Sequence, residues 1–231
     1  MTSIAANLQA VRARIAAACV AAGRAPGSVE LLAVSKTWPA ESVRAAVAAG
    51  QRAFGENYVQ EAVGKVTELG GLGLEWHFIG PLQSNKTRPV AENFAWVHTV
   101  DRLKIAERLA AQRPLNLPPL QICVQVNVSG EASKSGCVPE QAIELAAAVA
   151  RLPGLRLRGL MAIPEPTADT ARQRRQFAAL RQTLERINAE RDCRLDTLSM
   201  GMTDDLEAAI MEGATMVRIG TAIFGRREYT K

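Results

Sequence analysis

Residues 195–220 read LDTLSMGMTDDLEAAIMEGATMVRIG, and this stretch contains one full cycle of a pattern that runs through the chain. An apolar run at 195–199 is followed by a segment with helical spacing at 204–212 and by a second apolar run at 216–220. Two strands that are joined through a helix lie parallel, because a short turn can connect only antiparallel strands. The stretch therefore predicts a parallel strand–helix–strand unit.

The same alternation extends toward the N-terminus and gives eight strand candidates. They are residues 31–35, 53–55, 76–80, 96–99, 121–128, 157–162, 195–199 and 216–220, and helical stretches such as 41–49, 102–111, 141–152, 173–190 and 204–212 separate nearly all of them. Eight such units close into a barrel that has no exposed strand edge. An open doubly wound sheet is the alternative, but no G-x-G-x-x-G follows the first strand, and residues with reactive side chains follow many strands. We predict an α/β fold, a single (β/α)8 barrel of the TIM type over residues 1–231, with an extra N-terminal helix.

Composition narrows the class of protein. Hydrophobic residues make up 48% and charged residues 22%, which is ordinary for a globular protein. The net charge of +5 is spread along the chain, so a solvated surface is favoured over a nucleic-acid interface. The four cysteines and two histidines show no metal-ligand spacing and no C-x-x-C pair, which predicts no metal site and a reducing compartment.

The N-terminal segment resembles a signal peptide only superficially. Ile4, Leu8, Val11 and Ile15 recur at helical spacing, which favours an amphipathic first helix over an export signal. No uncharged apolar run approaches the length of a membrane span. We expect a cytoplasmic protein with no membrane partner.

The first strand candidate ends Val34-Ser35-Lys36-Thr37, at the rim where barrels carry their reactive groups. Lys36 can simply cap the strand and extend into solvent. If Lys36 instead points into the barrel mouth, desolvation favours its neutral amine, which attacks an aldehyde to form a Schiff base.

The ends of the seventh and eighth strands favour the second interpretation. Barrels often bind phosphate with the loops after these strands. Gly201 and Gly220 permit close approach of the backbone, and the hydroxyls of Ser199 and Thr221 can donate hydrogen bonds to phosphate oxygens. An amine opposite a phosphate site suits pyridoxal 5′-phosphate. Arg218 can then face the pyridine nitrogen and keep it unprotonated.

Several motifs occur together and in order: AVSKT at 33–37, FGENY at 54–58, WHFIG at 76–80, LQSNK at 82–86, SMGM at 199–202 and MVRIGTAIFG at 216–225. With these motifs the chain resembles the pyridoxal phosphate homeostasis protein family, which is related to the N-terminal barrel of alanine racemase; Pro81 stands where many relatives carry His. The resemblance implies a monomeric or weakly associating protein that holds pyridoxal 5′-phosphate. The predicted cofactor contacts are Lys36 (as a Schiff base), Asn57, Ser199, Met200, Arg218, Gly220 and Thr221.

The resemblance also implies storage and delivery of the cofactor, with an indirect effect on amino-acid pools, and apo forms of pyridoxal phosphate enzymes are candidate recipients. A racemase needs a base for the α-proton, which alanine racemase supplies from a second domain, and this chain ends after the eighth unit. We therefore expect no catalytic residue. A small amino-acid racemase or lyase that uses Lys36 as its base is the alternative. Lys134 is a candidate for a second aldehyde acceptor, and His77 is expected to be a packed histidine.

Overall fold

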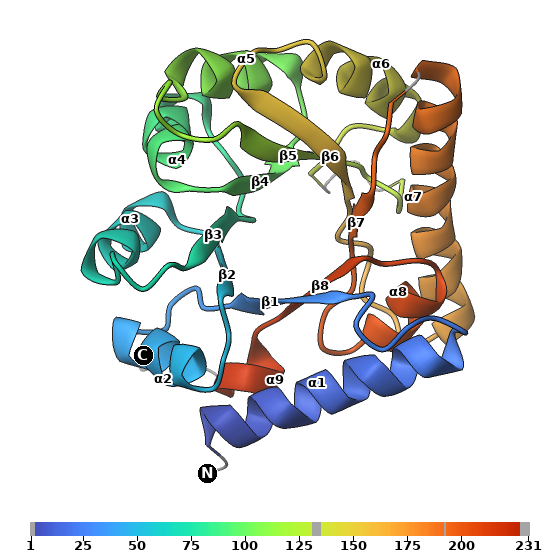
Figure 1. Cartoon of the computed structure of the whole chain (residues 1–231). Helices are drawn as coiled ribbons and strands as arrows, with labels where there is room; N and C mark the ends of the chain where they lie inside the picture. Colours follow the sequence, from blue (N-terminus) through green and yellow to red (C-terminus); the bar gives the residue numbers. More distant parts are fainter. Residues whose placement is uncertain (1–2, 131–134, 192, 227–231) are drawn as a thin grey trace.

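Eight parallel strands close into a barrel in the computed structural model, which describes residues 3–130, 135–191 and 193–226 (Figure 1). Each strand pairs in parallel with the next, and β8 pairs with β1 to complete the ring. The strands are β1 (Glu30–Val34), β2 (Ala53–Glu56), β3 (Glu75–Phe78), β4 (Trp96–Val100), β5 (Leu120–Gln125), β6 (Leu155–Met161), β7 (Thr197–Ser199) and β8 (Met216–Ile219). The predicted (β/α)8 barrel is confirmed.

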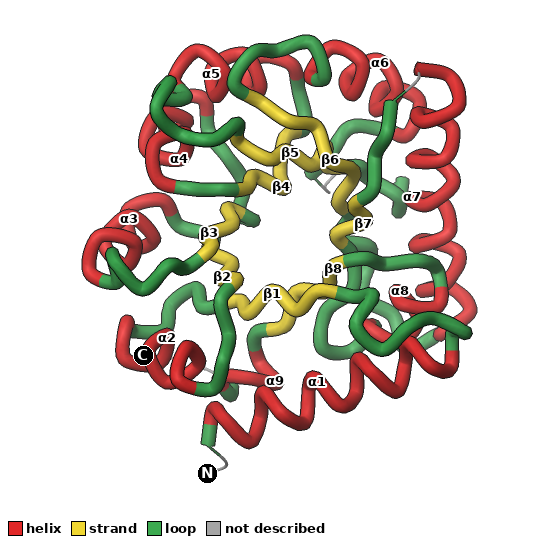
Figure 2. Tube along the Cα trace, viewed as in Figure 1, coloured by secondary structure: helices red, strands yellow, loops and turns green. Residues whose placement is uncertain are grey.

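Helices surround the strand ring, as Figure 2 shows in red around yellow. They are α1 (Ile4–Ala21), α2 (Ala40–Ala48), α3 (Val59–Glu68), α4 (Thr87–Asn93), α5 (Leu103–Gln112), α6 (Pro139–Val149), α7 (Thr170–Arg191), α8 (Leu206–Met211) and α9 (Thr221–Phe224), with a short 3-10 helix η1 (Ser84–Lys86) before α4. The sequence pattern did not single out α3 and α4. Both connect neighbouring strands on the outside of the ring, which parallel pairing requires.

Helix α1 is the extra N-terminal helix that the sequence predicts. By length and composition it is apolar enough to cross a membrane, with a mean hydropathy of 1.2 over 18 residues. In the fold it lies along the outside of the barrel and packs on α2, α8 and α9 (Figure 1). Leu8 and Ile15 are buried on its inner face, Arg12 donates to the carbonyl oxygen of Ala49 at 3.0 Å, and Arg14 pairs with Glu207. Helix α1 is thus part of the outer layer of the barrel.

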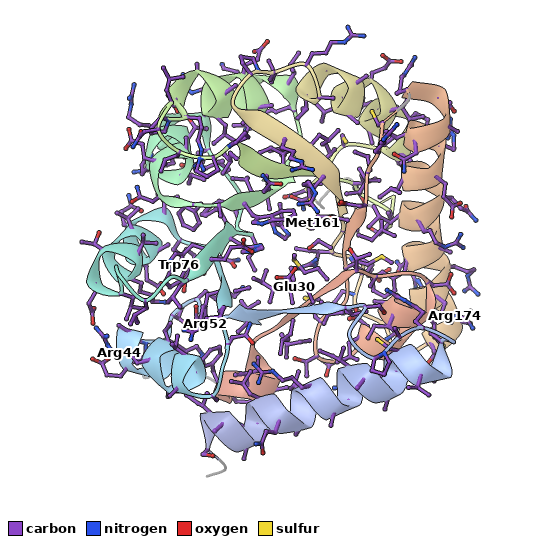
Figure 3. All side chains as sticks on the ribbon, viewed as in Figure 1. Glu30, Arg44, Arg52, Trp76, Met161 and Arg174 are labelled. Atoms are coloured by element: carbon purple, nitrogen blue, oxygen red, sulfur yellow. The ribbon has the colours of Figure 1, made fainter. Side chains whose placement is uncertain are left out.

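The strands have two buried faces. Their outward side chains join the large apolar cluster under the helices, and their inward side chains fill the ring. In Figure 3, Met161 and Glu30 lie toward the barrel axis, whereas Arg44 and Arg174 lie on the outside. The side chains that point into the ring also include four polar ones, His77, His98, Ser199 and Arg218. All four are buried in an interior that is otherwise mostly aliphatic.

Candidate functional site

A cavity of about 560 Å³ opens at the carboxyl ends of the strands. The predicted cofactor contacts Lys36, Asn57, Arg218, Gly220 and Thr221 all line it, together with apolar side chains from β1, the end of β3 and the end of β6. The carboxyl ends of parallel strands meet at one mouth of a barrel, which is why residues so distant in sequence share this space. The structure thus brings together most of the residues that the sequence singled out.

Ser199 and Met200 do not line this cavity. Met200 is fully buried in the cluster between strands and helices, and Ser199 is fully buried in the barrel interior. Strand β7 ends at Ser199, and the chain then turns at Gly201 in the left-handed region, with φ of +94°. The end of β7 therefore lies one layer below the cavity, and contact of these two residues with a ligand stays a prediction. Lys134 lies outside the described residues.

The backbone on both sides of Lys36 is fixed by polar contacts. On one side, the hydroxyl of Ser35 donates to Oε1 of Glu56 at 2.7 Å. On the other, the backbone N–H of Thr37 donates to Oε1 of Glu61 at 2.5 Å. Thr37 has a φ of +67°, a conformation that costs a β-branched residue roughly 1–3 kcal/mol. Such strain persists only where the surroundings impose it, so these contacts determine where Lys36 leaves the backbone.

Lys65 joins those contacts into one cluster. Its ammonium lies 2.8 Å from Oε1 of Glu56, 2.6 Å from Oε1 of Glu61 and 2.8 Å from the carbonyl oxygen of Ser35. The side chain of Glu56 is fully buried, and burial raises the pKa of its carboxyl even though Lys65 opposes that shift. No pattern in the sequence predicts this cluster. The spacing of Glu61 and Lys65 marks a helical ion pair, but nothing in the sequence marks Lys65 as buried.

Arg218 forms the floor of the cavity and is held from below. Its Nη1 donates to the carbonyl oxygen of Ser199 at 2.6 Å and to the hydroxyl oxygen at 2.9 Å, and its Nη2 donates to the carbonyl oxygen of Ala162 at 2.9 Å. A guanidinium has five N–H groups, so two have no partner within the described residues. Burial lowers the pKa of Arg218 to about 10, which leaves it charged at neutral pH.

These residues fit pyridoxal 5′-phosphate. The buried Oδ1 of Asn57 has no hydrogen-bond partner within the described part of the chain, so it can accept a bond from a ligand. Arg218 can donate to a ring nitrogen, the hydroxyl of Thr221 can donate to a phosphate oxygen, and Lys36 supplies an amine. A Cβ on Gly220 would lie 3.2 Å from the carbonyl oxygen of Val34, so the rim is closely packed where a phosphate is expected.

His77 and Thr203 lie at different depths in the barrel. His77 is fully buried, with Nε2 2.9 Å from Oε1 of Glu75 and Nδ1 2.9 Å from Nε2 of His98, so the prediction of a packed histidine is confirmed. Thr203 does not cap the helix after β7. Helix α8 begins at Leu206 after Asp205, and Thr203 lies at the cavity instead. The carboxylate of Asp205 accepts the backbone N–H of Met202 at 2.6 Å, which tightens the loop before the helix.

Comparison with known proteins places this geometry in a family. The family model for the alanine racemase N-terminal domain matches residues 3–228. The pyridoxal phosphate homeostasis protein of Pseudomonas aeruginosa is 67% identical over 99% of this chain and 98% of its own length. That of Escherichia coli K12 is 58% identical over 100% of both chains. Among solved structures, PipY of Synechococcus elongatus PCC7942 with pyridoxal phosphate bound is 38% identical, with a TM-score of 0.85 over 96% of this chain and 100% of PipY. An alanine racemase from Corynebacterium glutamicum, 17% identical with a TM-score of 0.68 over 95% of this chain and 62% of the racemase, shares the fold. The chain therefore belongs to the alanine racemase N-terminal domain family and, within it, to the pyridoxal phosphate homeostasis proteins.

Proposed function

We propose that this chain binds pyridoxal 5′-phosphate in the cavity at the carboxyl ends of the strands and serves intracellular homeostasis of that cofactor. The observation that carries the proposal is the meeting of Lys36, Arg218 and Thr221 at one cavity, where buried hydrogen bonds hold the Ser35 side chain beside Lys36 and the guanidinium of Arg218. The names of the closely related proteins and the cofactor in PipY support it. Storage in the cytoplasm by a monomer and delivery to apo enzymes are the finer parts of the proposal.

Each residue has a separate task. When bound, pyridoxal 5′-phosphate supplies an aldehyde that combines reversibly with amines. Lys36 provides the amine from a backbone that its neighbours Ser35 and Thr37 hold fixed. Arg218 donates from a charged guanidinium, so a ring nitrogen that accepts its N–H carries no proton of its own. A ring without that proton withdraws electrons weakly, which favours retention of the cofactor over turnover of amino acids.

The lining of the cavity also favours a binding role. Among the described residues that line it there is no histidine, tyrosine or cysteine to act as a second acid or base on a bound amino acid. Asp204 contributes a carboxylate at the rim. Catalysis by Lys36 or Asp204 is the outcome that the experiment has to separate from storage.

Absorbance and chemical trapping test the proposal. The purified protein with added cofactor is expected to show a visible absorption band, and borohydride reduction followed by peptide mass spectrometry should locate the cofactor on Lys36. Lys36→Ala should lose the band, whereas Lys104→Ala, at an exposed position of α5, should keep it. Reactivation of an apo enzyme by the loaded protein tests delivery, and chiral analysis after incubation with L-amino acids tests racemisation. A full-strength band in Lys36→Ala would refute the site, and D-isomer formed at ordinary enzymatic rates would refute the storage role.

A further inference from the structure

A line of hydrogen bonds crosses the barrel interior from the cavity to the opposite mouth. Arg218 Nη1 lies 2.9 Å from the hydroxyl oxygen of Ser199, which lies 2.8 Å from Nδ1 of His98. Nε2 of His98 lies 2.9 Å from Nδ1 of His77, and Nε2 of His77 lies 2.9 Å from Oε1 of Glu75. Glu75 is the first residue of β3, so its half-exposed carboxylate lies at the mouth opposite the strand ends that form the cavity.

The chemistry of Arg218 and Glu75 determines which groups donate and which accept at the two ends of this line. A guanidinium has only donors, so Ser199 Oγ accepts from Arg218. The hydrogen bond from His77 lowers the pKa of Glu75, so its carboxylate is ionised at neutral pH and only accepts. Nε2 of His77 therefore carries a hydrogen that points to Glu75. Burial lowers the pKa of His98 well below its usual value, so His98 carries a single ring N–H.

Two arrangements of the inner hydrogens remain. In the first, Ser199 donates to Nδ1 of His98, Nε2 of His98 donates to Nδ1 of His77, and both imidazoles are neutral. In the second, His98 donates to Ser199 and accepts from His77, which must then carry two N–H groups and a positive charge. In the second arrangement, Oγ of Ser199 accepts from both Arg218 and His98, so its hydroxyl hydrogen has no acceptor within the described residues. The first arrangement gives that hydrogen an acceptor in the line, so it is favoured.

We propose that Ser199, His98, His77 and Glu75 are positioning residues for Arg218, joined in a relay in which every hydrogen bond is donated in the direction from Arg218 to Glu75. The proposal rests on the proposed function in that Arg218 is the residue that meets the cofactor. Hydrogen bonds in such a chain polarise one another, so an anion at the far end strengthens the acceptor that Ser199 offers to Arg218. The carboxylate at one mouth thereby helps to hold the guanidinium at the other.

The residues at the far mouth also suggest a metal site, which is an alternative to the relay. One ligand atom each from Glu30, Glu75 and His77 lies within 4.8 Å of the others, a set that can hold a metal ion. In the relay, Nε2 of His77 carries a hydrogen and cannot ligate. The relay and a metal site at this mouth therefore exclude each other, and one experiment separates them.

The chain contains two histidines, and both belong to the relay, so the imidazole spectrum of protein labelled with ¹⁵N-histidine is directly interpretable. In cofactor-free protein at neutral pH, both rings are expected to be neutral with the hydrogen on Nε2. Ser199→Ala should shift the Nδ1 signal of His98 and leave the Nε2–H form of His77. A hydrogen on Nδ1 of either ring, a doubly protonated His77, or loss of the His77 N–H on addition of zinc at stoichiometric concentration would overturn the relay.

The functional half of the proposal uses the loaded protein. Glu75→Ala should accelerate release of pyridoxal 5′-phosphate to a trapping apo enzyme by about 3- to 10-fold, the effect of losing one modest hydrogen-bond contribution. Glu75→Asp should restore much of the slow release, and Glu30→Gln at the same mouth should leave the rate unchanged. Equal rates for Glu75→Ala and Glu30→Gln would overturn the positioning role. Failure of the wild type to bind cofactor would refute the proposed function instead, and the imidazole spectra of cofactor-free protein would still test the relay.

Discussion

The variant Lys65→Met removes the ammonium that neutralises Glu56, whose side chain is fully buried beside the backbone of Lys36. Methionine occupies a similar volume but cannot donate to Oε1 of Glu56 or to the carbonyl oxygen of Ser35, both of which lie 2.8 Å from the ammonium. Breaking one partner of a buried ion pair costs about 3–5 kcal/mol. We expect a loss of this size in the free energy of unfolding of the cofactor-free protein.

The loss should depend on pH in a defined direction. Burial already raises the pKa of Glu56 in the folded protein, and removal of Lys65 raises it further. Between the unfolded and the folded pKa, the folded state then binds more protons than the unfolded state, so stability falls as pH rises through that window. Urea titrations followed by circular dichroism should therefore show a larger deficit at about pH 8 than at about pH 5.

Two controls make the measurement specific to the buried pair. Arg44→Met removes one partner of an exposed ion pair, in which the Arg44 and Glu68 side chains are 48% and 53% exposed, and should cost below about 1 kcal/mol. The double variant Lys65→Met/Glu56→Gln removes both charges of the Lys65–Glu56 pair and should recover much of the loss. A deficit under about 1 kcal/mol for Lys65→Met at both pH values, or a double variant no more stable than the single one, would show that the pair does not hold this part of the site.

Two further sets of variants test the packing of the barrel and the state of its thiols. A Cβ on Gly159 would lie 1.8 Å from a carbonyl oxygen of β7, so Gly159→Ala should prevent formation of a soluble barrel that melts cooperatively. In α3, a Cβ on Gly64 meets no atom of a neighbouring element within 4 Å, so Gly64→Ala should raise the free energy of unfolding by about 0.5–1 kcal/mol. Equal melting temperatures for the two variants would contradict the close approach at Gly159. Burial raises the pKa of Cys123 to about 12 and that of Cys137 to about 11, so both should resist a thiol reagent in the native protein at neutral pH. The half-buried Cys193 should react first, and Cys193→Ser should remove the fast phase; a fast phase that persists would place reactivity elsewhere.

The strands were predictable because each is covered on both faces and therefore reads as a short apolar run. All eight runs coincide with strands, with ends displaced by a few residues; the fifth run was extended to 128, whereas β5 ends at Gln125. Helices α3 and α4 were less visible. Helix α3 directs Lys65 inward, against the usual preference of lysine, and α4 is a short helix that contains Pro89.

The parts of the site that depend on strand order were predictable from the sequence. The parts that depend on how far a side chain lies below the rim of the barrel were not. Strand order places Lys36 and Arg218 at one mouth, since β1 and β8 are neighbours in a closed barrel. The alternation of a strand does not say how far below the rim a residue lies, so the position of Ser199 beneath Arg218 was not foreseen. Contacts across the interior, such as that between His77 and His98, likewise depend on how side chains from β3 and β4 meet inside the ring.

Two polar clusters interrupt a core that is otherwise aliphatic, and each lies next to a residue that lines the cavity, Lys36 in one case and Arg218 in the other. Lys65 and its carboxylate partners hold the backbone around Lys36, and the relay through the two histidines holds Arg218. Well-packed apolar residues in place of buried polar networks are often neutral or stabilising, so global stability gives no reason for either cluster. The need for a fixed geometry at the site does give a reason for both clusters. An amine and a guanidinium that must meet the two ends of one small molecule need side chains that cannot drift, and satisfied buried hydrogen bonds restrict direction in a way that apolar contacts do not.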